Sequence, residues 1–317
     1  MNAQAINMNG LERSNIMSNI RKALIPLLCI LFIFGTIGCT AQGTQNTGAA
    51  KSSQPDKLRI GVIPSEDSEN VESKMEPLKN YLSKKLGLEV EIFVANDYTA
   101  VVEAMRSKQI DVAHLGPFSY LLATDKANAE AIVSKVTLET GLPTYKSVIL
   151  ARKDSGIKSI SDLKGKTFAF IDPASTSGNL VPRNELLKNG IDPDKDFSTS
   201  IYAGGGDASA LSVQNKKVDA GATSDTEYKT MMEKNLLPDV DIIHESAPIP
   251  TSPVAVRKDL DSGLIRKIKQ AYLDMDKESP ESLKALGLDK YGETKDSAYD
   301  NLREIAKILN VDLTKMK

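Results

Sequence analysis

Hydrophobic and polar residues follow one another along the chain with two different periods, which predict short strands and amphipathic helices. The β-branched run 57–64 stops at Pro64 and predicts a first strand. Helical spacing over the following residues ends at Gly87, a residue typical of helix C-termini. Residues 88–95 predict a second strand, and Asp97 stands where it can cap the helix that follows.

The same alternation continues through the rest of the chain. Residues 110–116 predict a strand, and the next helix has Pro117 in its first turn. A second group of elements predicts strands at 166–172, 197–203, 218–224 and 240–246, with helices at 159–165, 206–216 and 225–235 and after Ser177. Strands that alternate with helices are typical of parallel sheets. We therefore expect an α/β fold in which each domain is a mainly parallel sheet flanked by helices.

Two extended stretches, 145–154 and 248–259, separate these groups, and only helices are expected after the second stretch. A chain of this kind crosses between two domains twice. We therefore expect a discontinuous domain I (56–148 plus 251–317) and a domain II (149–250). A cleft between two such domains, near the carboxyl ends of their strands, is a common ligand site.

Composition and charge agree with a two-domain soluble protein. The chain has 317 residues, and a domain usually takes about 100–200 residues. Hydrophobic residues make up 41% and charged residues 26%, which is ordinary for a globular protein. The net charge of −2 gives no basic surplus for nucleic acid or an anionic membrane surface, so neither is expected as a partner.

The N-terminal region predicts a signal peptide. Apolar residues 23–38 follow two basic residues, and the run suits a signal core of about 7–15 residues better than a spanning helix of about 20. The run ends at Gly38-Cys39, which resembles the lipobox of bacterial lipoproteins and implies lipidation of Cys39. Residues 1–38 would then be the signal peptide, and an uncleaved anchor is the alternative.

The remaining N-terminal features agree with a lipid anchor. The chain has two cysteines, and Cys29 lies in the predicted signal core. Lipidation of Cys39 would leave the mature domain without a thiol, which excludes disulfides, thiol catalysis and cysteine metal sites. Residues 39–55, rich in Gly, Ser, Thr, Ala and Gln, predict a flexible tether at the extracytoplasmic face of the membrane. Met17 is an alternative start.

Three consecutive hydroxyl residues, Ser175, Thr176 and Ser177, stand where the strand 166–172 passes into a helix. The first N–H groups of a helix lack internal partners and carry partial positive charge, so a phosphate-like anion binds there readily. The hydroxyls would add further donors for the anion's oxygens. The alternative is a single Ser or Thr N-cap with two solvated neighbours.

Three other loops follow strands and begin helices, at 64–70, 115–120 and 203–209. Glycines at 204–206 would let backbone amides approach a ligand closely. A glycine run is also typical of a plain turn, and this one lacks both the lysine of a P-loop and dinucleotide-binding spacing.

Several ordered motifs together resemble one family. They are "LRIGVIP", "DYTAVVEAMRSKQIDVAHLGPFSY", "PTYKSVILARKDSGIKSISDLKGKTFAFIDPASTSGNLVPR", "GGGDASALSVQNKKVDAGATSD" and "IPTSPVAVRKDL". The chain is similar to the PhnD-like phosphonate/phosphite-binding proteins of ABC transporters. The resemblance implies the type II periplasmic binding-protein fold, a small oxyanion as ligand and an ABC permease as partner, and we expect a monomer.

The resemblance also implies roles for single residues. Ser175, Thr176 and Ser177 match the run that holds the phosphonate oxygens, and Tyr98 and Tyr145 match cleft tyrosines, with ordinary packing as the alternative for both.

Tyr120 and Ser119 are expected near the same cleft mouth. Gly206 stands where many members have histidine, so Asp207 or backbone amides would form that wall instead. Ser252 stands where members that bind aminoalkyl phosphonates tend to have an acid.

Asp225 and Glu227 remain as partners for an ammonium group, or else as a helix N-cap and a first-turn acid. Together with Ser252, this pattern favours a ligand without an amine, such as methylphosphonate or phosphite.

Enzymatic and metal-dependent functions are not supported by the sequence. The two histidines, His114 and His244, lie far apart in the chain and are expected to pack at strand ends. The chain has no clustered metal ligands and no nucleophile–base motif, so neither cofactor nor metal is expected. An enzyme acting on a phosphorylated metabolite, a sensor subunit, and a binding protein for phosphate or sulfonate are the alternatives.

Overall fold

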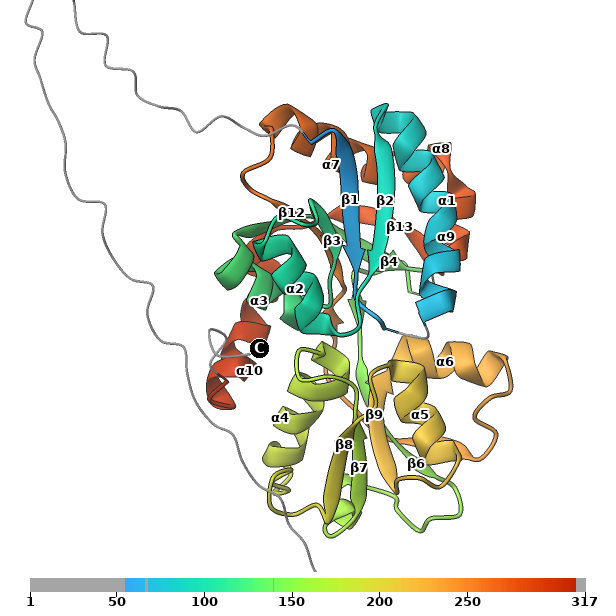
Figure 1. Ribbon diagram of the computed structural model, residues 1–317. Coiled ribbons are helices and arrows are strands. Elements are labelled where there is room, and N and C mark those ends of the chain that lie inside the picture. The colour runs from blue at the N-terminus through green and yellow to red at the C-terminus, as the bar shows by residue number, and fades with distance from the viewer. Residues whose placement is uncertain (1–54, 66–67, 139, 312–317) are drawn as a thin grey trace, which may run out of the picture. The chain divides into compact units, whose positions relative to one another are not determined.

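Two β-sheets organise the chain (Figure 1). The computed structural model describes residues 55–65, 68–138 and 140–311. The strands of the six-stranded sheet are β1 (Lys57–Val62), β2 (Glu89–Val94), β3 (Val112–His114), β4 (Ala129–Thr137), β12 (Pro253–Arg257) and β13 (Leu288–Glu293). They lie in the order β13-β4-β12-β3-β1-β2, so the sheet combines the N-terminal and C-terminal parts of the described chain.

The second sheet is built from the middle of the chain. Its strands are β6 (Ser147–Arg152), β7 (Thr167–Phe170), β8 (Thr199–Tyr202), β9 (Ala220–Ser224) and β10 (Val240–Glu245), in the order β10-β6-β9-β7-β8. Two short strands, β5 (Thr144–Tyr145) and β11 (Ile249–Pro250), pair antiparallel where the chain passes between the sheets.

The expected α/β fold is confirmed, and both sheets are mixed, with most strands of each sheet running in one direction. β1 is parallel to β2 and β3, whereas β12 is antiparallel to β3 and β4, and β13 is antiparallel to β4. In the second sheet β7 is parallel to β8 and β9, whereas β6 is antiparallel to β9 and β10. β6 and β12 are antiparallel to their neighbours because each of them enters its sheet from the other sheet, at the end where the neighbouring strands finish.

The expectation that only helices follow the second extended stretch is wrong, because β13 lies there. Leu288 and Tyr291 of this strand are buried, and its other residues are partly or fully exposed. β13 pairs with β4 alone, and such edge strands carry charged residues that mask a strand pattern.

The helices cover both sheets. Those beside the six-stranded sheet are α1 (Ser68–Leu86), α2 (Tyr98–Arg106), α3 (Pro117–Ala127), α7 (Ser262–Leu273), α8 (Met275–Glu278), α9 (Pro280–Ala285) and α10 (Asp300–Ile308). Those of the second sheet are α4 (Val181–Lys188), α5 (Gly206–Gln214) and α6 (Asp225–Glu233). Shorter turns are the 3-10 helices η1 (Ile160–Leu163) and η3 (Asp296–Tyr299) and the π-helix η2 (Thr176–Leu180). No helix within the described ranges is long and apolar enough to span a membrane.

Local signals in the sequence explain where two of these helices begin. The Asp97 carboxylate accepts the Ala100 N–H at 2.7 Å and caps α2, as predicted. Pro117 is the first residue of α3, also as predicted, because a helix start needs no N–H at that position. The two helix starts matter for the site, since both lie at strand ends of the six-stranded sheet.

Hydrophobic clusters fill both faces of each sheet. In β12, Val254 and Val256 belong to one cluster and Ala255 to another, as alternating side chains require. The cluster that contains Ala255 also contains Ile171 and Leu180, which belong to the loop after β7 and to η2. The buried members of all clusters lie between residues 58 and 306, within the compact unit 50–317. This unit therefore contains its own hydrophobic cores.

Candidate functional site

The run Ser175–Ser177 begins η2, which continues directly into α4. The Ser175 hydroxyl accepts the Gly178 N–H at 3.1 Å and so caps this helical segment. A Cβ atom on Gly178 would come within 2.3 Å of the Ile171 side chain, so only glycine lets this turn pack onto the end of the strand.

The three hydroxyl residues are buried, which corrects the alternative of one cap with two solvated neighbours. Thr176 and Ser177 are 2% and 7% exposed. The Thr176 hydroxyl accepts the Phe118 N–H from the first turn of α3 at 2.8 Å. The Ser177 carbonyl accepts the Ser147 hydroxyl at 2.6 Å. Backbone and side chain contacts therefore fix the run from two directions.

Two tyrosines contact the run. Tyr98, the first residue of α2, is 4% exposed, and its phenol is hydrogen-bonded by Ser175. Tyr145 of β5 is partly buried, and its phenol is hydrogen-bonded by Ser177 and Thr176. Burial raises the pKa of Tyr98 above its usual range and raises the pKa of Tyr145 to about 12. Both phenols therefore keep their protons at neutral pH and can act as donors.

Asp172 is a buried carboxylate at this site that sequence reasoning did not select. Its oxygens accept the Ala174 N–H at 2.7 Å and the Tyr98 N–H at 3.4 Å. Burial raises the pKa of the Asp172 carboxyl, and these N–H donors offset part of that rise. The signal in the sequence was a charged residue directly after an apolar strand. Asp172 therefore connects the turn that precedes the hydroxyl run to the first residue of α2.

Two further acids lie at the start of α6. Ser224 is the N-cap of this helix, because its hydroxyl accepts the Glu227 N–H, so Asp225 and Glu227 are first-turn residues. The Asp225 carboxylate accepts the Lys146 N–H at 3.0 Å. The negative charge of Asp225 contributes to the raised pKa of Tyr145, and that of Glu227 to the raised pKa of Tyr98. Both acids are therefore close enough to affect the two tyrosines.

Gly206 forms a close contact with β9. A Cβ atom there would lie 2.8 Å from the Thr223 hydroxyl oxygen. That hydroxyl is buried and has no hydrogen-bond partner among the described residues. The neighbouring Asp207 carboxylate accepts the Ala208 N–H at 2.7 Å, and its role in a ligand wall stays a prediction.

Tyr120 has structural partners. It is 1% exposed, its hydroxyl donates to Asp296 at 2.7 Å, and its ring packs on Tyr299 with centroids 5.0 Å apart. The Ser119 hydroxyl donates to the Gly116 carbonyl at 3.0 Å. These contacts explain why both residues are buried, and a ligand role for them stays a prediction.

The histidines pack at strand ends, as expected. His114 is buried, and its Nε2 atom lies 2.7 Å from the Tyr272 hydroxyl. Burial lowers the pKa of His114 to about 3, so this imidazole is neutral at physiological pH. His244 pairs with Glu185 at 3.1 Å.

Comparison with known proteins identifies the family of the chain. The model of the family described as "ABC transporter, phosphonate, periplasmic substrate-binding protein" matches residues 60–299. The chain is 35% identical over 229 residues to the phosphate-import protein PhnD of Mycolicibacterium smegmatis, covering 69% of this chain and 71% of that protein. It is 33% identical over 263 residues to the phosphonates-binding periplasmic protein of Escherichia coli, covering 80% and 77%.

Solved structures have the same fold. A binding protein component of an ABC phosphonate transporter from Pseudomonas aeruginosa superposes with a TM-score of 0.76 at 28% identity, covering 81% of this chain and 87% of that one. PhnD1 from Prochlorococcus marinus in complex with methylphosphonate superposes with a TM-score of 0.76 at 23% identity, covering 81% and 99%. The chain therefore belongs to the family of periplasmic substrate-binding proteins of phosphonate ABC transporters, which are transport proteins and not enzymes.

Proposed function

We propose that this protein captures a phosphonate-class oxyanion (a phosphonate, methylphosphonate or phosphite) between its two sheets and delivers it to an ABC permease. The observation that carries the proposal is the meeting of five hydroxyl groups, from Ser175, Thr176, Ser177, Tyr98 and Tyr145, at the start of η2. The family membership and the names of the relatives support the transport role.

The chemistry of the site suits an oxyanion. A fully ionised phosphonate group presents three oxygens that only accept hydrogen bonds, and the hydroxyls together with the helix-start N–H groups supply donors. Hydrogen bonds to a charged group contribute about 1.5–3 kcal/mol each, more than neutral ones. Exclusion of water by burial of the run would strengthen them further. The anion would thus be held by neutral donors placed by the fold.

The ligand's substituent is proposed to be small and without an amine. Neither Gly206 nor Ser252 has a charged side chain that could pair with an ammonium group. Asp225 and Glu227 affect the two tyrosines electrostatically, and they would meet the ammonium group if an aminoalkyl phosphonate did bind. The ligand residues proposed are Ser175, Thr176, Ser177, Tyr98 and Tyr145.

Phosphate is a second candidate ligand, favoured by the Mycolicibacterium smegmatis relative, whose name is phosphate-import protein. Phosphate has a fourth oxygen where a phosphonate has carbon. That oxygen would need an additional donor, whereas the substituent of methylphosphonate would need only an apolar contact with a tyrosine ring.

The N-terminal sequence supports a proposal for the position in the cell envelope. The predicted signal peptide (1–38), the lipidation site Cys39 and most of the tether (39–55) lie outside the described residues. We propose a lipid-anchored monomer at the extracytoplasmic face of the membrane, with domain I (56–148 plus 251–317) and domain II (149–250) enclosing the ligand.

Calorimetric titration of residues 40–317 tests the proposal. Methylphosphonate, phosphite, aminoethylphosphonate, phosphate and sulfate would be titrated under the same conditions. We expect one ligand per chain, with methylphosphonate or phosphite binding more tightly than aminoethylphosphonate and sulfate. Absence of heat and of thermal stabilisation with all five anions would overturn the proposal, and phosphate binding alone would favour the second candidate.

A further inference from the structure

Within the described part of the chain, three backbone N–H groups donate hydrogen bonds between loops of the six-stranded sheet and loops of the five-stranded sheet. Tyr98 N–H donates to the Asp172 carboxylate at 3.4 Å, Phe118 N–H to the Thr176 hydroxyl at 2.8 Å, and Gly206 N–H to the Ser65 carbonyl at 3.0 Å. Each donor lies in the first turn of a helix, where N–H groups have no partner inside that helix. Each of these donors therefore finds its acceptor only in a loop that belongs to the other sheet.

The bond to Thr176 differs from the other two because its acceptor belongs to the proposed anion-binding run. The Thr176 oxygen receives the Phe118 N–H, and the same hydroxyl hydrogen-bonds the Tyr145 phenol. The Thr176 hydroxyl therefore contacts both α3, beside the six-stranded sheet, and the connecting strand β5, while the Thr176 backbone is part of η2. A threonine hydroxyl has a single proton, so a bound anion and Tyr145 would compete for it.

Burial makes this bond costly to lose. Thr176 is 2% exposed and Phe118 is fully buried. If the hydroxyl were removed, the Phe118 N–H would remain buried without its partner, or the two sheets' loops would have to separate to let water reach it. The hydroxyl of Ser177, by contrast, bonds Tyr145, and its inter-element contact with Ser147 is made by its backbone carbonyl.

We propose that Thr176 couples anion binding to closure of the two sheets, as a positioning residue as well as a ligand residue. This inference rests on the proposed function. The Phe118 N–H fixes the Thr176 oxygen as an acceptor, and a bound anion would take over the hydroxyl proton from the Tyr145 phenol. Donation of that proton to a negative charge makes the oxygen a better acceptor, so anion contact and the bond to α3 strengthen each other. By linkage, closure then favours binding to the same degree that binding favours closure.

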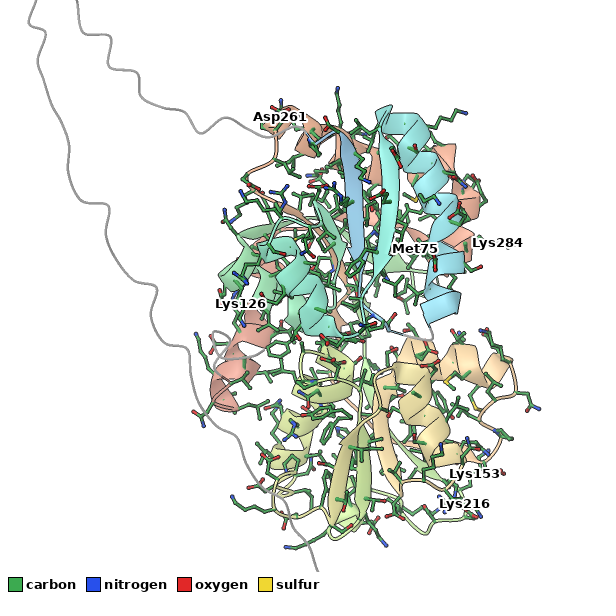
Figure 2. The ribbon with its side chains drawn as sticks, in the orientation of Figure 1. Met75, Lys126, Lys153, Lys216, Asp261 and Lys284 are labelled. Carbon is green, nitrogen blue, oxygen red and sulfur yellow. The ribbon has the colours of Figure 1, made fainter. Side chains whose placement is uncertain are left out.

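A distance measurement separates closure from affinity. Residues 40–317 contain neither Cys29 nor Cys39, so dyes can be placed at Lys153→Cys, beside β6, and Lys284→Cys, on α9 (Figure 2). Energy transfer between the dyes is recorded while methylphosphonate or phosphate is added to saturation. The variants are Thr176→Val, which removes the hydroxyl at similar volume, Thr176→Ser, which keeps it, and Ser177→Ala. Circular dichroism and thermal melting check that each variant is folded.

The proposal predicts different end points for the variants. Ser177→Ala should need more ligand but reach the wild-type energy transfer at saturation. Thr176→Val should stop short of that end point, because its closing equilibrium is weakened by about 5- to 150-fold, and Thr176→Ser should restore it.

A wild-type end point for Thr176→Val at saturation would overturn the proposal. If Thr176→Val did not fold, Thr176→Ala would replace it as the variant without the hydroxyl. An end point for Thr176→Ser no closer to wild type than that of Thr176→Ala would then overturn the proposal. Failure of the proposed function looks different, because no anion would then change energy transfer or release heat with the wild-type protein.

Discussion

Removal of the Ser177 hydroxyl is the perturbation whose effect on ligand affinity follows most directly from the site. Ser177 is 7% exposed, and its hydroxyl lies at the Tyr145 phenol, within the run that begins η2. Its second contact, from the Ser147 hydroxyl, goes to the backbone carbonyl and survives in Ser177→Ala. The substitution therefore removes a proposed anion donor and leaves the backbone connection in place.

The size of the effect follows from the strength of one charge-assisted hydrogen bond. A loss of about 1.5–3 kcal/mol corresponds to a rise in Kd of about 10- to 150-fold. The loss should be similar for every oxyanion, because the donor addresses the oxygens that these ligands share. The free energy of unfolding should change by about 1 kcal/mol or less, since a neutral hydrogen bond contributes little net stability.

Isothermal titration calorimetry measures the affinities, and urea unfolding measures stability. Ser161→Ala is the matched control, because Ser161 is an exposed serine in η1 whose hydroxyl bonds Ser159. Wild-type affinities for methylphosphonate, phosphite and phosphate in Ser177→Ala would refute the assignment of Ser177 as an anion donor. A fall in affinity confined to one ligand would refute the reasoning that it binds the shared oxygens.

Three further predictions address other parts of the account. Tyr98→Phe should lower the affinity for every oxyanion, because its phenol is proposed as one of the donors to the oxygens that these ligands share; unchanged affinities in a titration panel would count against it. Gly206→Ala should destabilise the fold by about 1–3 kcal/mol, because its Cβ would lie 2.8 Å from the Thr223 oxygen, and Thr223→Ala should relieve part of that loss in urea melts. The free energy of unfolding should fall as the pH decreases from about 6.5 towards 3, by up to about 1.4 kcal/mol per pH unit, because His114 with its lowered pKa stays neutral in the folded protein and binds a proton on unfolding. His114→Gln should flatten that slope in melts at pH 5 and 7 relative to His244→Gln, and an unchanged slope would show that His114 does not set it.

Local patterns explain why much of the fold could be predicted. The cap at Asp97 and the proline start at Pro117 depend on neighbours within a few residues, and both helices begin where the sequence indicates. Strand direction depends instead on which sheet a strand comes from. The periodicity of β12 does not encode that it returns from the other sheet, and the charged edge strand β13 has a weak strand pattern.

The same difference between local and long-range information applies to the site. The hydroxyl run was visible because three hydroxyl residues in succession follow an apolar strand. The bond from Phe118 to Thr176 joins residues 58 positions apart, and the contact of Tyr98 with Asp172 joins residues 74 apart. Neither contact has a local signature, so the burial of the run and the role of Asp172 needed the three-dimensional arrangement.

The crystal structure of residues 40–317 with methylphosphonate would test the central claim most directly. The account predicts that the phosphonate oxygens lie about 2.5–3.0 Å from the hydroxyls of Ser175, Thr176 and Ser177, with the phenols of Tyr98 and Tyr145 in the same shell. Methylphosphonate bound elsewhere, with these hydroxyls keeping only their partners within the protein, would contradict it.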